Sequence, residues 1–178
     1  DLTLCYGIYS YVRKVADVQY DCEDVESCRM YSTLIFSSRH AVEGFLKALI
    51  QKNMDVRILM DKQIWCIGRK TEKALIQKGL WCDQVFTDYQ TMFEDVTDEQ
   101  QVCYIKGQGV QSTLPSLSCY QIREISFDLP DVRWDALCVT CPQSMRILVQ
   151  KGISLQIPLF CFSHKSLQEA QKLGFTNI

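Results

Sequence analysis

The chain has 178 residues, of which 47% are hydrophobic, and a formal net charge of -2. This hydrophobic content suffices for a packed core, so we do not expect global disorder. With this nearly balanced charge we do not expect the basic surface that is typical of nucleic-acid binders. No apolar run approaches the ~18 residues that are needed to span a bilayer.

The first ten residues, DLTLCYGIYS, lack the basic start and the long apolar stretch of a signal peptide. We therefore expect a cytoplasmic protein whose ten cysteines stay reduced, most of them as small core hydrophobes. They are Cys5, Cys22, Cys28, Cys66, Cys82, Cys103, Cys119, Cys138, Cys141 and Cys161. The one Cys-x-x-C pair, Cys138 and Cys141, has no second pair at zinc spacing, so a metal or redox role is not favoured.

Two segments alternate apolar and polar residues, ADVQYDCEDV at 16–25 and YQIREISFDLP at 120–130. A period of two is typical of strands. Each segment precedes a region that reads as alternating strands and helices. We expect the two segments to pair as an antiparallel linker, covering about residues 18–29 and 120–131, that joins two lobes.

The chain also repeats a strand–turn–helix unit. Residues 34–45 (LIFSSRHAVEGF) and 137–148 (LCVTCPQSMRIL) each read as an apolar strand, small hydroxyl or thiol residues, and a helix. Residues 64–80 and 159–175 each read as a strand, a basic pair, a hydroxyl residue and a helix closed by glycine. Strands that alternate with helices predict an α/β fold, here two lobes that each hold a parallel sheet flanked by helices.

The linker segments divide these units between the lobes. One lobe is discontinuous and comprises residues 1–20 plus 131–178, and the inserted lobe comprises residues 30–120. Residues 100–109 (QQVCYIKGQG) predict a further strand in the inserted lobe, followed by a weak helix that contains Pro115.

Ligands bind at the carboxyl ends of the strands in open α/β sheets, so the candidate site lies at the strand-to-helix junctions. The candidate binding residues are Ser37, Ser38, Arg39, His40, Gly68, Arg69, Lys70, Lys106, Gly107, Thr140, Cys141, His164 and Lys165. Helix capping explains the hydroxyl residues, but the helix dipole disfavours basic residues at helix starts. The recurring basic residues therefore predict a site for an anion.

Several common sites are absent from the sequence. Neither G-x-x-x-x-G-K-[ST] nor G-x-G-x-x-G occurs, so no phosphate loop is predicted. Ser37 and Ser38 lack the glycines of a nucleophile elbow, and the two histidines are too far apart in sequence to indicate a metal site. A small molecule with several anionic groups, bound without a metal or organic cofactor, remains as the hypothesis.

Five short motifs follow one another in a fixed order. They are FSSRHAV at 36–42, CIGRKTEKAL at 66–75, YIKGQ at 104–108, CVTCPQSMRIL at 138–148 and CFSHKSLQEA at 161–170. They resemble, in this order, the FTSxNAV, AVGxxTAxAL, LLRGD, VFTSPSAVxAL and AIGPTTAEAL motifs of the uroporphyrinogen-III synthase family. Order and spacing agree over residues 1–178.

The resemblance implies two α/β lobes joined by a two-stranded ladder. It also implies cyclisation of hydroxymethylbilane, with inversion of ring D and loss of water, a step of tetrapyrrole (heme) biosynthesis that needs no cofactor. Thr71 and Ser166 match positions where the family keeps hydroxyls, which makes them the candidate catalytic residues. Hydroxymethylbilane or a related polycarboxylate tetrapyrrole is the expected partner of a monomer that binds neither nucleic acid nor membrane.

The chain departs from the family in several places. The tyrosine of the second linker strand falls on Phe127 or Asp128, and Tyr120 lies several residues away. The lobe that holds the termini is shorter than in the family pattern. We expect a divergent, shortened member; the alternative is a non-catalytic relative that binds a tetrapyrrole or another polyanion, or an interaction module.

Overall fold

The computed structural model describes residues 2–5, 8–11, 14–129 and 131–178, with the backbone alone for the first two ranges. Residues 1, 6, 7, 12 and 13 of the expected discontinuous lobe and Pro130 of the expected linker lie outside the described residues, as does the side chain of Cys5. The chain divides into two compact units, Asp1–Asp17 with Glu124–Ile178, and Val18–Arg123. It passes between them within β3 (Ala16–Tyr20) and at the end of β8 (Ser116–Glu124).

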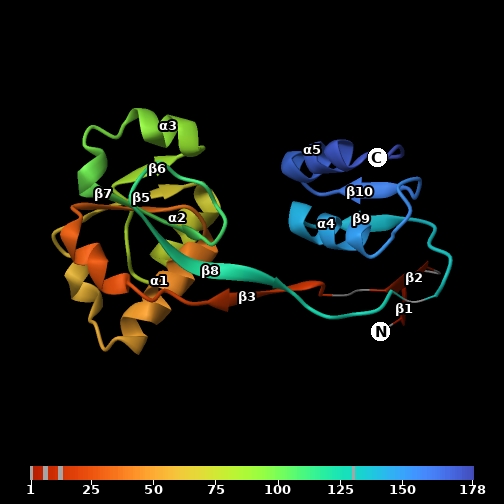
Figure 1. Ribbon diagram of the computed structural model, residues 1–178, viewed down its shortest axis with the longest axis horizontal. Coiled ribbons are helices and arrows are strands. Elements are labelled where there is room, and N and C mark those ends of the chain that lie inside the picture. The colour runs from red at the N-terminus through yellow and green to blue at the C-terminus, as the bar shows by residue number, and fades with distance from the viewer. Residues whose placement is uncertain (1, 6–7, 12–13, 130) are drawn as a thin grey trace. The chain divides into compact units, whose positions relative to one another are not determined.

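The Val18–Arg123 unit is built on a six-stranded sheet of order β3-β8-β7-β4-β5-β6 (Figure 1). Its remaining strands are β4 (Thr33–Phe36), β5 (Gln63–Ile67), β6 (Gln84–Phe86) and β7 (Val102–Gly107). The pairs from β8 to β6 are all parallel. All four residues of β4 are buried, as expected for a central parallel strand that is covered on both faces.

Helices cover both faces of this sheet. They are α1 (Arg39–Gln51), α2 (Arg69–Ile76) and α3 (Tyr89–Glu94), with the short 3-10 helices η1 (Val25–Met30), η2 (Val56–Leu59) and η3 (Glu99–Gln101). Alternate residues of β4 belong to different cores: Leu34 and Phe36 pack with α1, and Ile35 packs with Met92 of α3. The predicted α/β fold with a largely parallel sheet flanked by helices is therefore confirmed for this unit.

The strand–turn–helix repeat is present in both units. The first copy gives β4–α1 and β5–α2, and the second gives β9 (Leu137–Val139)–α4 (Pro142–Gln150) and β10 (Leu159–Cys161)–α5 (His164–Leu173). β9 and β10 pair in parallel over a core that includes Met145, Leu159 and Ala170. No described helix of either unit is long and apolar enough to cross a membrane.

The parallel sheet of the smaller unit has fewer strands than the sheet of the larger unit. Among the described residues it has only the two strands β9 and β10. The N-terminal strands β1 (Leu2–Cys5) and β2 (Ile8–Tyr11) pair with each other as an antiparallel hairpin instead of extending it. The expectation of a sheet flanked by helices thus holds here only in reduced form.

The two alternating segments do form neighbouring strands, but several residues earlier than predicted. Asp21 N donates to Cys119 O at 3.3 Å and Ile125 N donates to Val15 O at 3.1 Å, so the segments run antiparallel. β8 also pairs in parallel with β7, which places it inside the six-stranded sheet. Residues 25–30 form η1 and residues 125–129 form no strand. The predicted linker ended too late because the alternation of polar and apolar residues continues beyond the last hydrogen bonds between the two strands.

The weak helix predicted after residues 100–109 is wrong. Residues 108–115 form a turn and an irregular connection, and β8 then returns parallel to β7. Pro115 lacks an N–H and Gly109 has a positive φ of 81°, and neither fits a helix interior. This connection is shorter than the helical crossover that usually joins parallel strands.

Candidate functional site

Three of the predicted junctions meet at one edge of the larger sheet. The order β7-β4-β5 places the three parallel strands side by side, so that their carboxyl ends lie together. Ser37 to His40 follow β4, Gly68 to Thr71 follow β5, and Lys106 and Gly107 close β7. The structure therefore brings nine of the candidate binding residues, and Thr71, to the same edge.

Hydrogen bonds of two serines hold the start of α1 in place. Ser37 N donates to Ile105 O at 3.0 Å. Ser38 is the N-cap: its Oγ accepts from Ala41 N at 3.2 Å and donates to Tyr120 Oη at 3.1 Å. Ser37 and Ser38 are thus hydrogen-bonding residues of the turn, while Arg39 beside them is exposed.

The start of α2 presents its basic residues and buries its hydroxyl. Gly68 takes a positive φ of 83° and donates from its N to Phe86 O at 2.8 Å. Arg69 pairs with Glu72 at 2.9 Å, and Lys70 is exposed. Thr71 is 3% exposed and its Oγ1 donates to Ile67 O at 2.7 Å. The hydroxyl proton of this catalytic candidate is therefore engaged by the strand end.

The end of β7 is shaped by a glycine. A Cβ at Gly107 would lie 2.6 Å from Cζ of Tyr120, so only glycine lets this ring lie across the strand end. Lys106 Nζ donates to Val110 O at 2.8 Å. Next to it, burial raises the pKa of Tyr104 to about 12, and a hydrogen bond from the Ser37 side chain opposes the rise.

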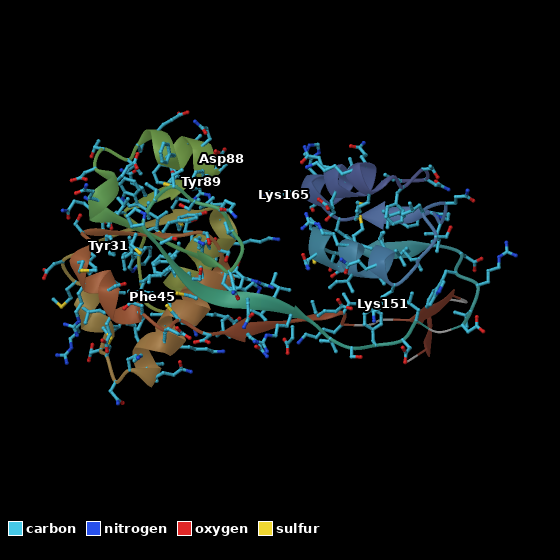
Figure 2. The ribbon with its side chains drawn as sticks, in the orientation of Figure 1. Tyr31, Phe45, Asp88, Tyr89, Lys151 and Lys165 are labelled. Atoms are coloured by element: carbon cyan, nitrogen blue, oxygen red, sulfur yellow. The ribbon has the colours of Figure 1, made fainter. Side chains whose placement is uncertain are left out.

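The remaining candidates lie in the smaller unit, at the carboxyl ends of β9 and β10, which are also parallel neighbours. Thr140 is exposed, and Cys141 Sγ lies 3.1 Å from Ser144 Oγ. His164 is exposed with Nε2 3.1 Å from Gln168 Nε2, and Lys165 lies at the start of α5 (Figure 2). Ser166 is fully buried, and its Oγ lies 2.9 Å from the capping Ser163 Oγ.

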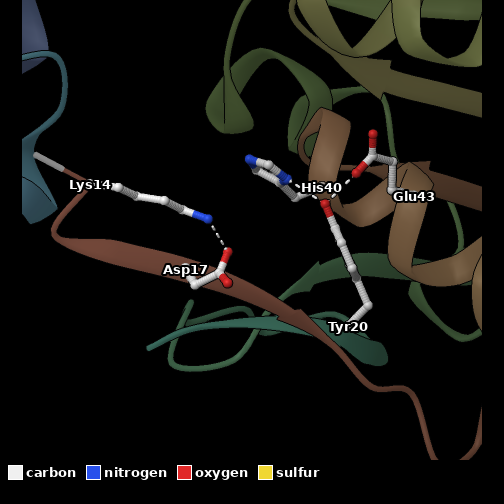
Figure 3. A network of polar contacts seen from close by, with 5 residues as sticks. All are labelled: Lys14, Asp17, Tyr20, His40 and Glu43. Carbon is white, nitrogen blue, oxygen red and sulfur yellow. Dashed lines mark hydrogen bonds and ion pairs between the residues drawn. The ribbon is translucent and has the colours of Figure 1, made fainter. Parts of the chain in front are cut away.

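A cluster around His40 was not predicted from the sequence. His40 Nδ1 lies 2.9 Å from Tyr20 Oη, and the Tyr20 hydroxyl donates to Glu43 Oε2 (Figure 3). The centroid of the Tyr120 ring lies 5.6 Å from the centroid of the His40 ring, and Lys47 Nζ lies 3.9 Å from the centroid of the Tyr20 ring. The sequence offered a signal, because positions 40, 43 and 47 share one face of a helix. We call Tyr20, His40 and Glu43 the phenol–imidazole cluster.

Charge within this cluster is unevenly distributed. Burial, and secondarily the neighbouring Arg39, lowers the pKa of His40, while Glu43 acts in the opposite direction. The Tyr20 hydrogen bond, with smaller contributions from nearby basic groups, holds the pKa of Glu43 below its ordinary value. A neutral imidazole beside an ionised carboxylate is the resulting state near neutral pH.

The position expected for the family's tyrosine holds no phenol. Phe127 is 4% exposed and packs with Val15 and Ile147, and Asp128 is exposed. Tyr120 belongs to β8 and contacts the start of α1 in the larger unit.

The cysteines are mostly core residues. The nine with described side chains are free thiols, and five of them are buried: Cys22, Cys28, Cys66, Cys103 and Cys119. Cys138 is exposed and is not among the core cysteines; its strand β9 belongs to a two-stranded sheet. Among the described residues, no three His, Cys, Asp or Glu side chains group as a metal site.

Comparison with known families places the chain in a defined class of protein. Residues 11–118 match the family described as uroporphyrinogen-III synthase HemD, more than half of the chain. The chain belongs to this family. No curated protein matches the sequence.

Solved structures agree at the level of the fold. The uroporphyrinogen-III synthetase of Helicobacter pylori 26695 matches with a TM-score of 0.70 at 14% identity, over 92% of this chain and 82% of that one. A mutant uroporphyrinogen III synthase from the extremely thermophilic bacterium Thermus thermophilus matches with a TM-score of 0.61 at 11% identity, over 92% and 79%. The wild-type Thermus enzyme gives 0.55 at 12% identity, over 92% and 79%.

Proposed function

We propose that this chain is a uroporphyrinogen-III synthase that cyclises hydroxymethylbilane with inversion of ring D and loss of water. The observation that carries the proposal is the shared sheet edge, where the starts of α1 and α2 and the end of β7 gather Arg39, Arg69, Lys70 and Lys106. Family membership supports the same reaction.

The substrate's acetate and propionate groups suit this edge. Helix N-termini offer unpaired N–H groups and a partial positive charge, worth roughly 0.3–1 kcal/mol for each carboxylate and up to ~2 kcal/mol when partly buried. Several such contacts would hold a flexible linear tetrapyrrole in the folded geometry that selects the product. The binding residues are, in this proposal, the thirteen junction residues predicted from the sequence, with Thr71 and Ser166 near the reacting groups.

We further propose that the two compact units are the two lobes of the synthase, with residues 1–20 plus 131–178 in one and residues 30–120 in the other. The protein acts as a cytoplasmic monomer and uses no metal or organic cofactor. Sedimentation at several concentrations tests the monomer, and activity after dialysis against a chelator tests the absence of a metal.

A second candidate is a non-catalytic relative that binds a tetrapyrrole or another polyanion. The hydroxyl of Thr71 is engaged by Ile67 O, the Ser166 hydroxyl lies against Ser163, and Phe127 replaces the expected phenol. These features leave the basic junctions intact while weakening the case for catalysis.

One experiment separates the candidates. Hydroxymethylbilane is added to the protein, and the ratio of the III isomer to the I isomer is measured. A ratio well above that of the spontaneous reaction supports the synthase. A spontaneous ratio together with saturable tetrapyrrole binding supports the non-catalytic relative.

A further inference from the structure

A chain of two hydrogen bonds ties His40 to a carboxylate. His40 and Glu43 lie in the first turns of α1, three residues apart and therefore on one face of the helix. Tyr20 reaches both from the end of β3: its Oη lies 2.9 Å from His40 Nδ1 and its hydroxyl donates to Glu43 Oε2. All three residues belong to the Val18–Arg123 unit.

The proton positions follow from the chemistry of the three groups. An ionised carboxylate only accepts and a phenol has one proton, so that proton lies toward Glu43. The Tyr20 oxygen is then the acceptor for His40, which places a proton on Nδ1. Because a neutral imidazole carries a single proton, Nε2 keeps its lone pair. Figure 3 shows Nε2 directed away from Tyr20 and Glu43.

The surroundings keep the ring neutral near neutral pH. Burial and Arg39 lower the pKa of His40, and Glu43 raises it. The other groups that face the cluster are Lys47 over the Tyr20 ring and the Tyr120 ring from β8. Lys78, beyond the end of α2, is a further positive group that acts on Glu43. Among the described residues, no hydrogen bond to Nε2 competes with a ligand.

Cyclisation needs a group that accepts a proton. The reaction breaks the carbon–oxygen bond of a hydroxymethyl group. To invert ring D it also breaks the carbon–carbon bond that joins this pyrrole to its methylene bridge, and it forms two new carbon–carbon bonds that attach the ring in the opposite sense. Hydroxide leaves, and a proton must leave the pyrrole for its aromatic system to be restored. The proton and the hydroxide together make the one water released, so the reaction balances without an oxidant or reductant.

We propose that Tyr20 and Glu43 hold His40 as the Nδ1–H tautomer, so that Nε2 accepts the proton released on cyclisation. This inference rests on the proposed function and gives it a proton acceptor. Tyr20 and Glu43 act as positioning residues, since they reach the substrate only through His40. The imidazolium formed is stabilised by the same chain, because its Nδ1–H points through Tyr20 to the Glu43 carboxylate.

The tautomer is measured first, without substrate. The chain has two histidines, so the nitrogen spectrum of labelled protein is assigned with a His164→Gln variant. We expect His40 to carry its proton on Nδ1 at pH 7.5 and to lose that preference in Tyr20→Phe. Tyr31→Phe removes a phenol outside the cluster and should leave the His40 signals unchanged. A wild-type proton on Nε2 overturns the proposal.

Kinetics then test the proton transfer. His40→Gln should lower kcat for the III isomer about 100-fold, and Tyr20→Phe and Glu43→Gln roughly tenfold each. Glu43→Gln should also move the acid limb of the kcat/KM profile to lower pH, because Glu43 raises the pKa of His40. Glu94→Gln, at an exposed position of α3, is the matched control. Each variant is checked for native folding by circular dichroism.

Different results would overturn the proposed function and the role of His40. A wild-type protein that forms no excess of III isomer overturns the proposed function and, with it, the role of Nε2. An active wild-type protein whose His40→Gln variant keeps full activity overturns the proton acceptor alone. If the Glu43→Gln variant is folded and the acid limb of its kcat/KM profile stays at the wild-type pH, the positioning role of Glu43 is overturned.

Discussion

Gly44 of α1 lies against the backbone of Cys119 in β8, and a Cβ at Gly44 would come within 2.0 Å of the Cys119 carbonyl oxygen. The contact brings the helix that carries His40 close to the strand that carries Tyr120. Ser38 Oγ donates to Tyr120 Oη at 3.1 Å within the same contact. The start of α1 is therefore positioned by direct packing on β8.

Replacing Gly44 tests this packing. Gly44→Ala should lower the free energy of unfolding by roughly 1–3 kcal/mol, because α1 must shift away from β8. On an exposed helix the same change would stabilise the protein by about 1 kcal/mol. Urea denaturation gives the measurement, with Gln51→Ala at the exposed end of α1 as control. An increase in stability would show that α1 does not pack closely on β8.

Thr71 combines a buried hydrogen bond with a proposed place near the substrate. Thr71→Ala should leave Ile67 O without its side-chain donor and reduce III-isomer formation about tenfold, the equivalent of one hydrogen bond. Thr71→Ser keeps the hydroxyl and should retain most of the activity. Steady-state assays on both variants give the comparison. Unchanged activity in Thr71→Ala would remove this residue from the site.

The His40 environment predicts a pH dependence of stability. Its pKa in the folded protein is lower than the ordinary value of 6.5, so the unfolded chain binds more protons between the two values. Stability should thus be fully present above pH 6.5 and fall as the pH drops toward the folded pKa. His40→Gln should flatten the unfolding free energy measured over this window, whereas His164→Gln, at an exposed ring, should not. An equally steep decline in His40→Gln would assign the effect to other groups.

The cysteines should differ widely in reactivity. Thiolates are the reactive form, and burial raises the pKa of Cys103 to about 12, while Cys138 is exposed. Native-state alkylation followed by mass spectrometry should modify Cys138 long before Cys103, and unfolding should equalise the two. Comparable native rates at both positions would contradict the buried location of β7.

The sequence was sufficient to predict the individual strand–turn–helix units, but not where the linker strands end or how β7 connects to β8. The apolar run before Ser37 and the capping Ser38 predicted β4 and α1, because strand burial and helix capping depend on neighbouring residues. The connection at 108–115 was mistaken for a weak helix, since β7 and β8 return in parallel through an unusually short path. Such a crossover depends on tertiary pairing that no local pattern records.

The position of the candidate residues at the ends of the strands was predictable from the sequence, whereas most of their side-chain contacts were not. The basic residues after β4 and β5 and at the end of β7 were chosen as candidates because ligand sites lie at strand ends in this fold class. The partners of His40 were missed because Tyr20 contacts α1 only through the position of β3 at the edge of the sheet, which the local sequence does not reveal. Glu43 was not singled out from the sequence.

The proposed function is best tested by the ratio of isomers that the wild-type chain forms from hydroxymethylbilane. We expect the III isomer to predominate strongly over the I isomer, and the excess to fall when Arg69 and Lys70 are both replaced by glutamine. A ratio equal to that of the spontaneous reaction, in a protein that is folded by circular dichroism, would contradict it.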